Sequence, residues 1–236
     1  MTSLTQLIDC KQDIKSAIIE KGVEVTGGLT SYADAIRQIK SGISSLIEVP
    51  INTRFYGSKW AVAPIIETAN WTDMSSMFYN CTNMTHIPRY DTSSVTSMDN
   101  MFTQCYSLNT LPLLDTSKVI DMGFMFYSCT SLISLPTIDA SRVRDVEAMF
   151  YYCTSLTDIK GLLNLGMYGN LIGTDTLFKD CDNLTHDSLL NIINNLYDRK
   201  TAGYSVLTLK LHANVSALLS DEDIAIATDK GWAISY

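Results

Sequence analysis

The stretch DTSSVTSMDNMFTQCYSLNTLP at residues 91–112 decides the fold, because DTSKVIDMGFMFYSCTSLISLP at residues 115–136 keeps the same frame. The element Met-Phe-x-x-Cys begins at Met77, Met101, Met125 and Met149, which is a period of 24 residues. A fifth version, Leu177-Phe178-x-x-Cys181, follows after 28 residues, so one copy carries a four-residue insertion near 161–173. Self-similarity at a short fixed period is typical of repeat proteins.

Each cysteine is followed by an L-x-x-L-x-L spacing, as in Leu108, Leu111 and Leu113, which is typical of a leucine-rich-repeat strand. An Asp-Thr-Ser turn comes next, then a valine and a methionine. We expect an α/β fold: a leucine-rich-repeat solenoid of about six 24-residue coils with short parallel strands and short helical turns. The recurring Val, Met, Met-Phe, Cys and Leu positions are expected to point inward, with Phe78, Phe102, Phe126, Phe150 and Phe178 in one buried column.

Three further features refine the repeat. A proline recurs at residues 64, 88, 112 and 136, and because proline has no N–H to donate, backbone pairing should stop there and the strands should be short. The array is expected to begin near Phe55 with a degenerate copy in which Gly57 occupies the cysteine position. Lys160-Gly161 replaces the expected proline, so the repeat should be irregular over residues 157–175.

The two ends of the chain follow other patterns, which predicts three parts: an N-terminal helical docking module at 1–45, the solenoid at 46–184, and a helix-strand-helix cap at 185–236. Apolar periodicity predicts helices over about 4–21 and 30–40. In the last part we expect a helix from Asp187, a strand at 207–211, and a helix from the capping box Ser220-x-x-Asp223 to Thr228. This last part should close the open edge of the strands.

Composition narrows the function. The chain has 236 residues, 46% of them hydrophobic, and 17 Lys and Arg against 25 Asp and Glu give a net charge of -8. No basic run is present, so nucleic acid is not expected as a partner. The sequence shows no secretion signal and no apolar run of ~18 residues, so we expect no membrane insertion.

The repeat unit D-T-S-x-V-x-x-M-x-x-M-F-x-x-C-x-S-L-x-x-L-P resembles the BspA-like leucine-rich repeats of bacterial surface proteins, and the likeness covers about residues 60–184. Residues 7–23, LIDCKQDIKSAIIEKGV, with YADAI at 32–36, are similar to a helical module of tailed-bacteriophage tail and fibre proteins. Residues 219–232, LSDEDIAIATDKGW, are similar to the closing segment of phage proteins that carry these repeats. The resemblance implies a virion protein that presents a repeat surface.

The recurring cysteines and the recurring aspartates could each be structural or form a functional site. The cysteines at 81, 105, 129, 153 and 181 form a line without a CxxC pair, so buried reduced thiols are favoured over disulfides or a zinc site. Asp91, Asp115 and Asp139 form a second line, for which ordinary turn chemistry is favoured over calcium. We expect no metal and no cofactor.

Two surfaces are candidates for binding. Tyr79, Tyr127 and Tyr151 follow the phenylalanine in three copies and Tyr152 adds a ring, which favours a stacked aromatic face that binds sugars or a protein. Packing between coils is the alternative for these rings. The second surface is the outward side of the strands, represented by His86, Asn109, Thr110 and Asp158.

No arrangement of residues typical of an enzyme is present, so we expect a non-enzymatic protein. The expected function is a structural and binding protein of a tailed-phage virion, assembled in the host cytoplasm. Its partners would be other virion proteins, reached through the N-terminal helices, and a host surface glycan or protein; we expect a homo-oligomer. The alternative is an adhesin on the bacterial cell surface.

Overall fold

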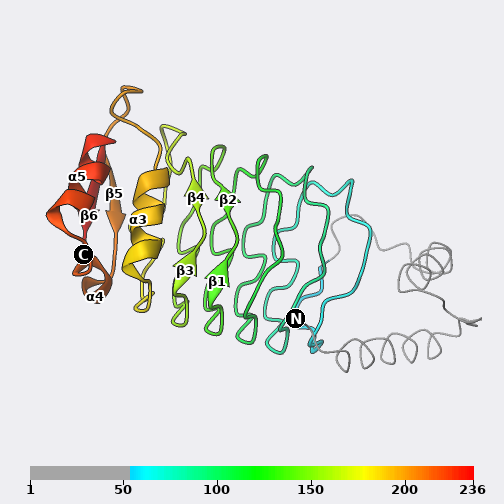
Figure 1. Ribbon diagram of the computed structural model, residues 1–236. Helices are drawn as coiled ribbons and strands as arrows, with labels where there is room; N and C mark the ends of the chain where they lie inside the picture. Colours follow the sequence, from blue (N-terminus) through cyan, green and yellow to red (C-terminus); the bar gives the residue numbers. More distant parts are fainter. Residues whose placement is uncertain (1–53) are drawn as a thin grey trace, which may run out of the picture. The chain divides into compact units, whose positions relative to one another are not determined.

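A computed structural model describes residues 54–236, and it is a mixed α/β arrangement of short parallel strands and few helices (Figure 1). The predicted N-terminal module at 1–45, with its predicted helices at 4–21 and 30–40, lies outside the described residues. The elements, in chain order, are β1 Ser134–Leu135, β2 Ile138–Asp139, β3 Asp158–Ile159, β4 Leu162–Leu163, α3 His186–Asn195, β5 Leu207–Lys210, α4 Ala213–Ser216, α5 Asp221–Asp229 and β6 Trp232–Ser235.

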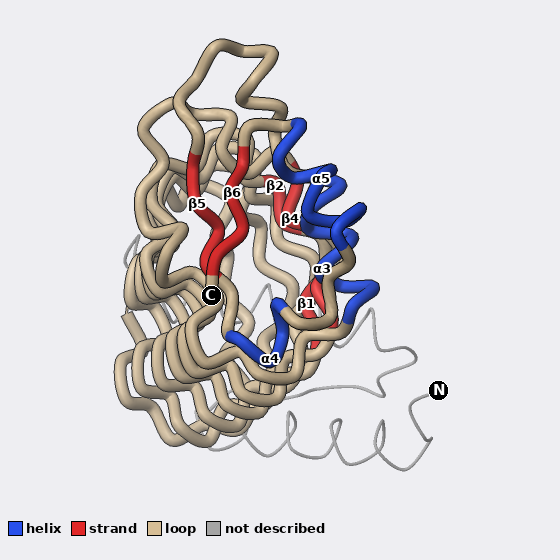
Figure 2. The backbone as a smooth tube through the Cα atoms, turned by 90° about the vertical axis from the view of Figure 1, so that its left-hand side faces the viewer, coloured by secondary structure: helices blue, strands red, loops and turns tan. Residues whose placement is uncertain are grey.

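Successive copies of the repeat lie side by side in parallel. β1 pairs with β3 and β2 pairs with β4, each in parallel. Isolated parallel bridges continue the same arrangement along one line, from Asp73 to Ser97, Asp121, Asp145 and Ile172. Figure 2 shows the superposed turns of chain behind the C-terminal elements. The strands are two residues long, so the prediction that they are short is confirmed.

The Met-Phe segment is not the helical turn that the sequence predicted. Its alternate amides donate to the next copy, as in Phe78 N to Met101 O at 2.9 Å, while the amides between them close tight turns, as in Cys81 N to Phe78 O at 3.1 Å. Residues before the methionine and before the cysteine are left-handed, with φ of 56° at Ser76 and 58° at Asn80. A continuous helix would direct every amide along its own axis, so it would leave the next copy unpaired.

The phenylalanine column is confirmed. The rings of Phe78, Phe102, Phe126, Phe150 and Phe178 are at most 1% exposed, and neighbouring rings are stacked with centroids 5.4 to 5.7 Å apart. The cysteines complete this core: the thiol of Cys105 donates to the carbonyl of Phe78 and that of Cys129 to the carbonyl of Phe102, both at 3.1 Å. Each thiol thus satisfies a buried carbonyl of the preceding copy.

The five repeat cysteines are free and buried, so the predicted reduced thiols are confirmed. Burial raises the pKa of the Cys105, Cys129 and Cys153 thiols, and raises that of Cys181 to about 12. Turn chemistry at the Asp-Thr-Ser positions is also confirmed, because Asp139 Oδ1 accepts from Ser141 N at 2.9 Å.

The third leucine of the L-x-x-L-x-L spacing, Leu113, is 57% exposed, and Leu114 is buried. One detail of the predicted register is wrong. In the first copy, Phe55 stacks on Phe78 and Gly57 is left-handed with φ of 66°. Gly57 therefore corresponds to Asn80, not to a cysteine, and this step of the repeat is 23 residues long.

The helix α3 covers the open edge of β3 and β4, as the sequence predicted for the C-terminal part. Ser188 Oγ accepts from Ile159 N at 3.0 Å, and Asn191 Nδ2 donates to Lys160 O at 2.8 Å. Beyond it, β5 and β6 form a parallel pair, and α5 begins at the predicted capping box of Ser220 and Asp223. The side chains of α3 thus provide hydrogen-bonding partners that a further copy would otherwise supply.

Candidate binding surface

Three tyrosines from two neighbouring copies form one aromatic group, which we call the tyrosine cluster: Tyr127, Tyr151 and Tyr152. The rings of Tyr127 and Tyr151 are stacked, 5.3 Å apart and 13° from parallel. Tyr152 meets Tyr151 edge-on at 4.4 Å and Tyr127 edge-on at 6.3 Å. Tyr152 is 42% exposed, so the cluster reaches solvent.

The backbone explains this geometry. Tyr127 and Tyr151 follow two phenylalanines whose rings are 2° from parallel, so the adjacent side chains are also brought into register. Tyr152 has a left-handed φ of 60°, which turns its side chain away from the direction that a right-handed residue would take. The Lys179 ammonium lies 4.9 Å above the Tyr151 ring, a cation–π contact, and Tyr151 raises the pKa of this lysine. One cation, Lys179, therefore borders the cluster.

Tyr79, the third tyrosine predicted at this register, does not belong to this cluster. Thr103 stands between Tyr79 and Tyr127; it is 3% exposed and donates its hydroxyl hydrogen to Phe124 O at 2.6 Å. Tyr79 stacks instead on Tyr56, at 4.9 Å and 6°. Sequence reasoning missed Tyr56, although Phe55-Tyr56 repeats Phe78-Tyr79 at an interval of 23 residues and could have revealed it.

The predicted strand-face residues form two rows across neighbouring copies. Ser134 pairs with Asp158 in the β1–β3 ladder, and Ile133 N donates to Asn109 O at 3.3 Å. Many polar groups in these rows already have partners: His86 Nδ1 lies 2.7 Å from Thr85 Oγ1, the hydroxyl of Thr110 donates to Asn109 Oδ1 at 3.3 Å, and Asp158 is paired with Lys160. Several polar groups of this face are therefore already engaged within the protein.

A histidine–aspartate pair joins α3 to α5, and sequence reasoning missed it. His186 Nε2 lies 3.0 Å from Asp223 Oδ2, the same oxygen that accepts from Ser220 N and Ser220 Oγ at 2.9 Å. Hydrogen bonding to Asp223 raises the pKa of His186, and hydrogen bonds from His186 and Ser220 lower the pKa of Asp223 to about 2. His186 is the first residue of α3. The group stabilises the start of α5.

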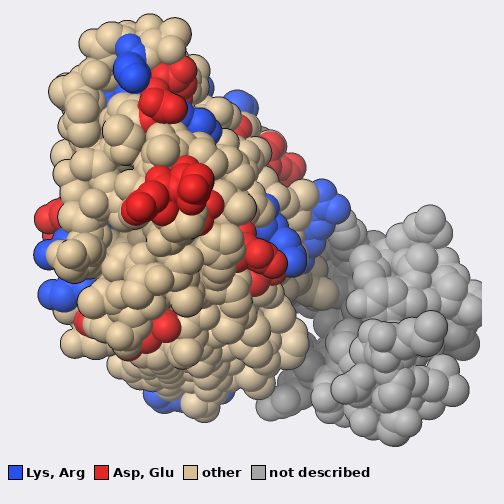
Figure 3. Space-filling view, turned by 60° about the vertical axis from the view of Figure 1, so that its left-hand side comes forward, with Lys and Arg blue, Asp and Glu red and all other residues tan. Residues whose placement is uncertain are grey.

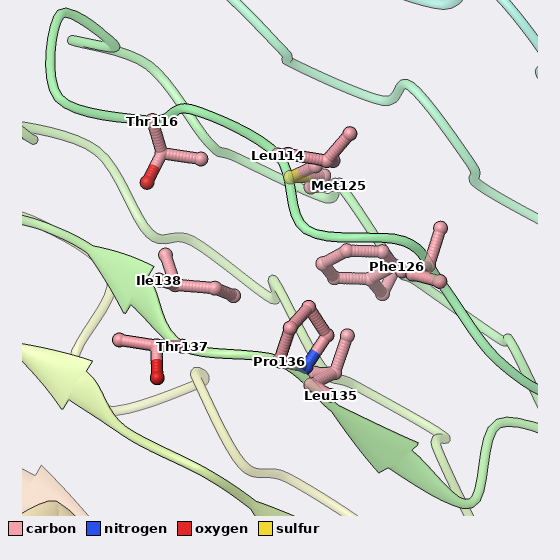
Figure 4. A pocket seen from close by; sticks show the side chains of 9 residues that line it. Leu114, Thr116, Met125, Phe126, Leu135, Pro136, Thr137 and Ile138 are labelled. Carbon is pink, nitrogen blue, oxygen red and sulfur yellow. The ribbon is translucent and has the colours of Figure 1, made fainter. Parts of the chain in front are cut away.

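One cavity between the repeat copies is very small. The cavity in Figure 4 measures only about 10 Å³ and is lined by side chains that include Leu114, Met125, Phe126 and Ile138. It is a gap between packed copies, too small and too apolar to hold a ligand. No tyrosine of the cluster lines this cavity.

An acidic row follows the parallel bridges. Carboxylate oxygens of Asp99, Asp121 and Asp145 surround Gly123, each 3.3 to 3.5 Å from where a Cβ would stand. Burial, with the like charges of Asp99 and Asp145, raises the pKa of Asp121. Within residues 54–236, no group of three or more His, Cys, Asp or Glu side chains is arranged to hold a metal ion.

Charges are mixed on the surface. On the face drawn in Figure 3, Lys and Arg side chains are interspersed with Asp and Glu rather than joined in a continuous basic area. Of the helices in the described part of the chain, none combines the length and the apolar character that crossing a bilayer requires.

Comparison with known proteins gives one match. A family model described as "Mycoplasma protein of unknown function, DUF285" matches residues 54–165, which run from the first copy with Phe55 to just beyond β4. No curated protein and no solved structure matches the chain. The similarity thus coincides with the repeats.

Proposed function

We propose that this protein is a non-enzymatic binding protein, built on a BspA-like leucine-rich-repeat solenoid, whose tyrosine cluster contacts a glycan or a protein. The fold part rests on the 24-residue parallel stacking of copies and on the buried phenylalanine and cysteine columns. The binding part rests on one observation: Tyr127, Tyr151 and Tyr152 form a preordered aromatic group that reaches solvent. Rigid rings provide large contact area at low cost in conformational entropy.

We further propose that the protein acts in the virion of a tailed phage. Support comes from the resemblance of residues 7–36 and 219–232 to phage tail and fibre proteins. In this setting the N-terminal segment joins other virion proteins and the repeats contact the host surface or a neighbouring virion protein. The second candidate, a bacterial surface adhesin, is favoured by the resemblance of the repeats to those of surface proteins. Gold-labelled antibody on intact phage particles and on bacterial cells separates the two locations.

Packing between copies is the competing role for the tyrosines, and the exposure pattern argues for more than packing. In the neighbouring copy, the residue after the phenylalanine is Thr103 instead of a tyrosine, and its hydroxyl is hydrogen-bonded. Stacked rings at this register are therefore not needed to hold the copies together. Tyr152 contacts both of the other rings and is still 42% exposed, so part of its surface is free for a ligand.

The test is the double variant Tyr127→Ala, Tyr151→Ala, compared with Tyr56→Ala, Tyr79→Ala, which removes the other stacked pair. Adsorption of particles to host cells and incorporation into particles are measured beside the unfolding midpoint of each variant. We expect the first variant to lose at least tenfold in one of the two assays and the second to keep both. Normal performance of the first variant, with normal stability, removes the tyrosine cluster from the site.

A further inference from the structure

The four-residue insertion forms a loop at residues 164–170, between β4 and α3. In Figure 1 this yellow-green loop stands at the same edge as the orange loop that precedes β5. Arg199 holds this loop through three hydrogen bonds. Its Nη1 donates to Gly166 O at 2.6 Å and to Tyr168 O at 3.1 Å, and its Nη2 donates to Gly169 O at 3.2 Å. Arg199 is fully buried, so these hydrogen bonds anchor the loop to the interior of the protein.

A hollow of about 290 Å³ lies at this loop. It is lined by Arg144, Tyr168, Gly169 and Asn170. The Arg144 guanidinium lies 4.6 Å from the centre of the Tyr168 ring. Arg142, two residues earlier, also acts on Tyr168: both arginines lower the pKa of its hydroxyl. Tyr168 and Arg144 therefore meet in the hollow, and Arg142 lies near enough to interact with the tyrosine.

Both arginines are exposed, and neither forms an ion pair with a carboxylate anywhere in residues 54–236. Neither guanidinium charge is neutralised by a carboxylate of the described residues, although acidic residues exceed basic ones by eight in the chain. A guanidinium presents a planar set of donors that matches a carboxylate in a two-point contact. The charge of this hollow is thus available to a ligand.

We infer that the hollow binds a carboxylate-bearing sugar, a hexuronate unit of an acidic glycan, with Arg144 and Arg142 holding the carboxylate. Asn170 contributes an amide that both donates to and accepts from hydroxyl groups, and Tyr168 contributes a ring and a hydroxyl. The hollow lies near the small end of the usual volume of ligand sites, in agreement with one sugar ring. Its lining contains no aliphatic side chain on which an acidic peptide could anchor.

The site is independent of the tyrosine cluster, since it shares no residue with it. It exists only because the insertion breaks the 24-residue period: a regular copy would pass from β4 to the next Met-Phe segment without the loop that carries Tyr168 and Asn170. The insertion thus adds a site to the repeats.

The experiment titrates the full chain with trigalacturonate, triglucuronate and neutral galactotriose, followed by NMR line shifts. We expect one of the two uronates to bind with a Kd in the millimolar range or below, and galactotriose to bind at least tenfold more weakly. The variant Arg142→Gln, Arg144→Gln should weaken uronate binding at least tenfold. The matched control Lys59→Gln, Lys210→Gln, which removes the same charge elsewhere, should leave it unchanged.

Several results would overturn the inference. Absence of binding by both uronates, equal binding of galactotriose, or full binding by the arginine variant each removes the sugar site. Equally tight binding of a triglutamate peptide would show that the hollow selects carboxylates without regard to the sugar. Loss of uronate binding in Tyr127→Ala, Tyr151→Ala would move the glycan to the tyrosine cluster.

Discussion

Arg199 and Gly166 are 33 residues apart in the chain, yet the guanidinium donates a 2.6 Å hydrogen bond to the glycine carbonyl. Gly166 is left-handed with φ of 85°, and a Cβ there would stand 2.3 Å from Trp232 Cζ2. The guanidinium also lies 5.3 Å from the Tyr204 ring centre and donates to Ser205 O through Nε. One buried cation therefore fastens the irregular copy to the C-terminal elements.

Replacing Arg199 with methionine should lower the free energy of unfolding by about 3–5 kcal/mol, because it leaves several buried carbonyls without donors. Arg199→Lys keeps the charge but loses the planar donor set. Its free energy of unfolding should therefore lie between that of the wild type and that of Arg199→Met. Urea denaturation followed by circular dichroism measures both. Equal stability of wild type and Arg199→Met would show that water replaces the guanidinium.

Phe126→Ala should destabilise the protein by about 3–5 kcal/mol, because it removes a ring stacked between two others in the middle of the core. Ile133→Ala is the control: its side chain is 52% exposed, so the change should stay within about 0.5 kcal/mol. The measurement is the denaturant midpoint of each variant. Equal midpoints for both variants would contradict a column that supports the stack.

The repeat cysteines should be unreactive toward thiol reagents in the folded protein. In a Cys10→Ser background, the remaining five thiols should react with Ellman's reagent only after denaturation, because burial raises the pKa of four of them far above that of a free thiol and each is sealed by a hydrogen bond to a phenylalanine carbonyl. Counting released thionitrobenzoate at pH 8 with and without guanidinium tests this. Rapid reaction of several thiols in the native state would argue against the sealed column.

The sequence was sufficient for features that recur and insufficient for features that occur once. Periodicity located the core of Phe126 and Cys129, because identical positions in successive copies must occupy equivalent places. It could not reveal the left-handed residues, since Ser76 and Ala148 share no side-chain property that requires a positive φ. Their conformation follows from hydrogen bonding to the next copy.

The single contacts escaped prediction for a related reason. Arg199 reaches Gly166, and His186 reaches Asp223, only after the C-terminal segment folds back on the irregular copy. Nothing in the local sequence around either residue indicates its partner. Only the capping box of Ser220 and Asp223, a local pattern, was visible in advance, and it became the centre of the His186 contact.

Deleting residues 1–45 should leave the repeats folded, because residues 54–236 contain the phenylalanine column and its covering α3. The same deletion should abolish self-association or incorporation into particles, if the sequence prediction of a docking module is right. Sedimentation of the full chain and the truncated chain compares their masses. A truncated chain that fails to fold would instead make this segment part of the repeat core.

The His186–Asp223 pair should make stability depend on pH in a window set by the two groups. The pKa of folded His186 lies above its ordinary value of 6.5, so its contribution is complete below that pH and is lost as pH rises through the raised value. The pKa of folded Asp223, about 2, lies below its ordinary 3.8, so its contribution is present above 3.8 and is lost as pH falls toward 2. The pair should therefore stabilise α5 most between about pH 4 and 6.5.

His186→Gln tests this window, because glutamine keeps a donor for Asp223 but does not titrate. The difference in urea midpoint between wild type and variant should be largest near pH 5 and should shrink as pH rises above 6.5, since only the wild type loses a charge there. His86→Gln is the control, because among the described residues no carboxylate pairs with His86, which bonds to Thr85 instead. A His186→Gln difference that stays constant from pH 5 to 8 would show that the hydrogen bond alone, without the histidine charge, holds α3 to α5.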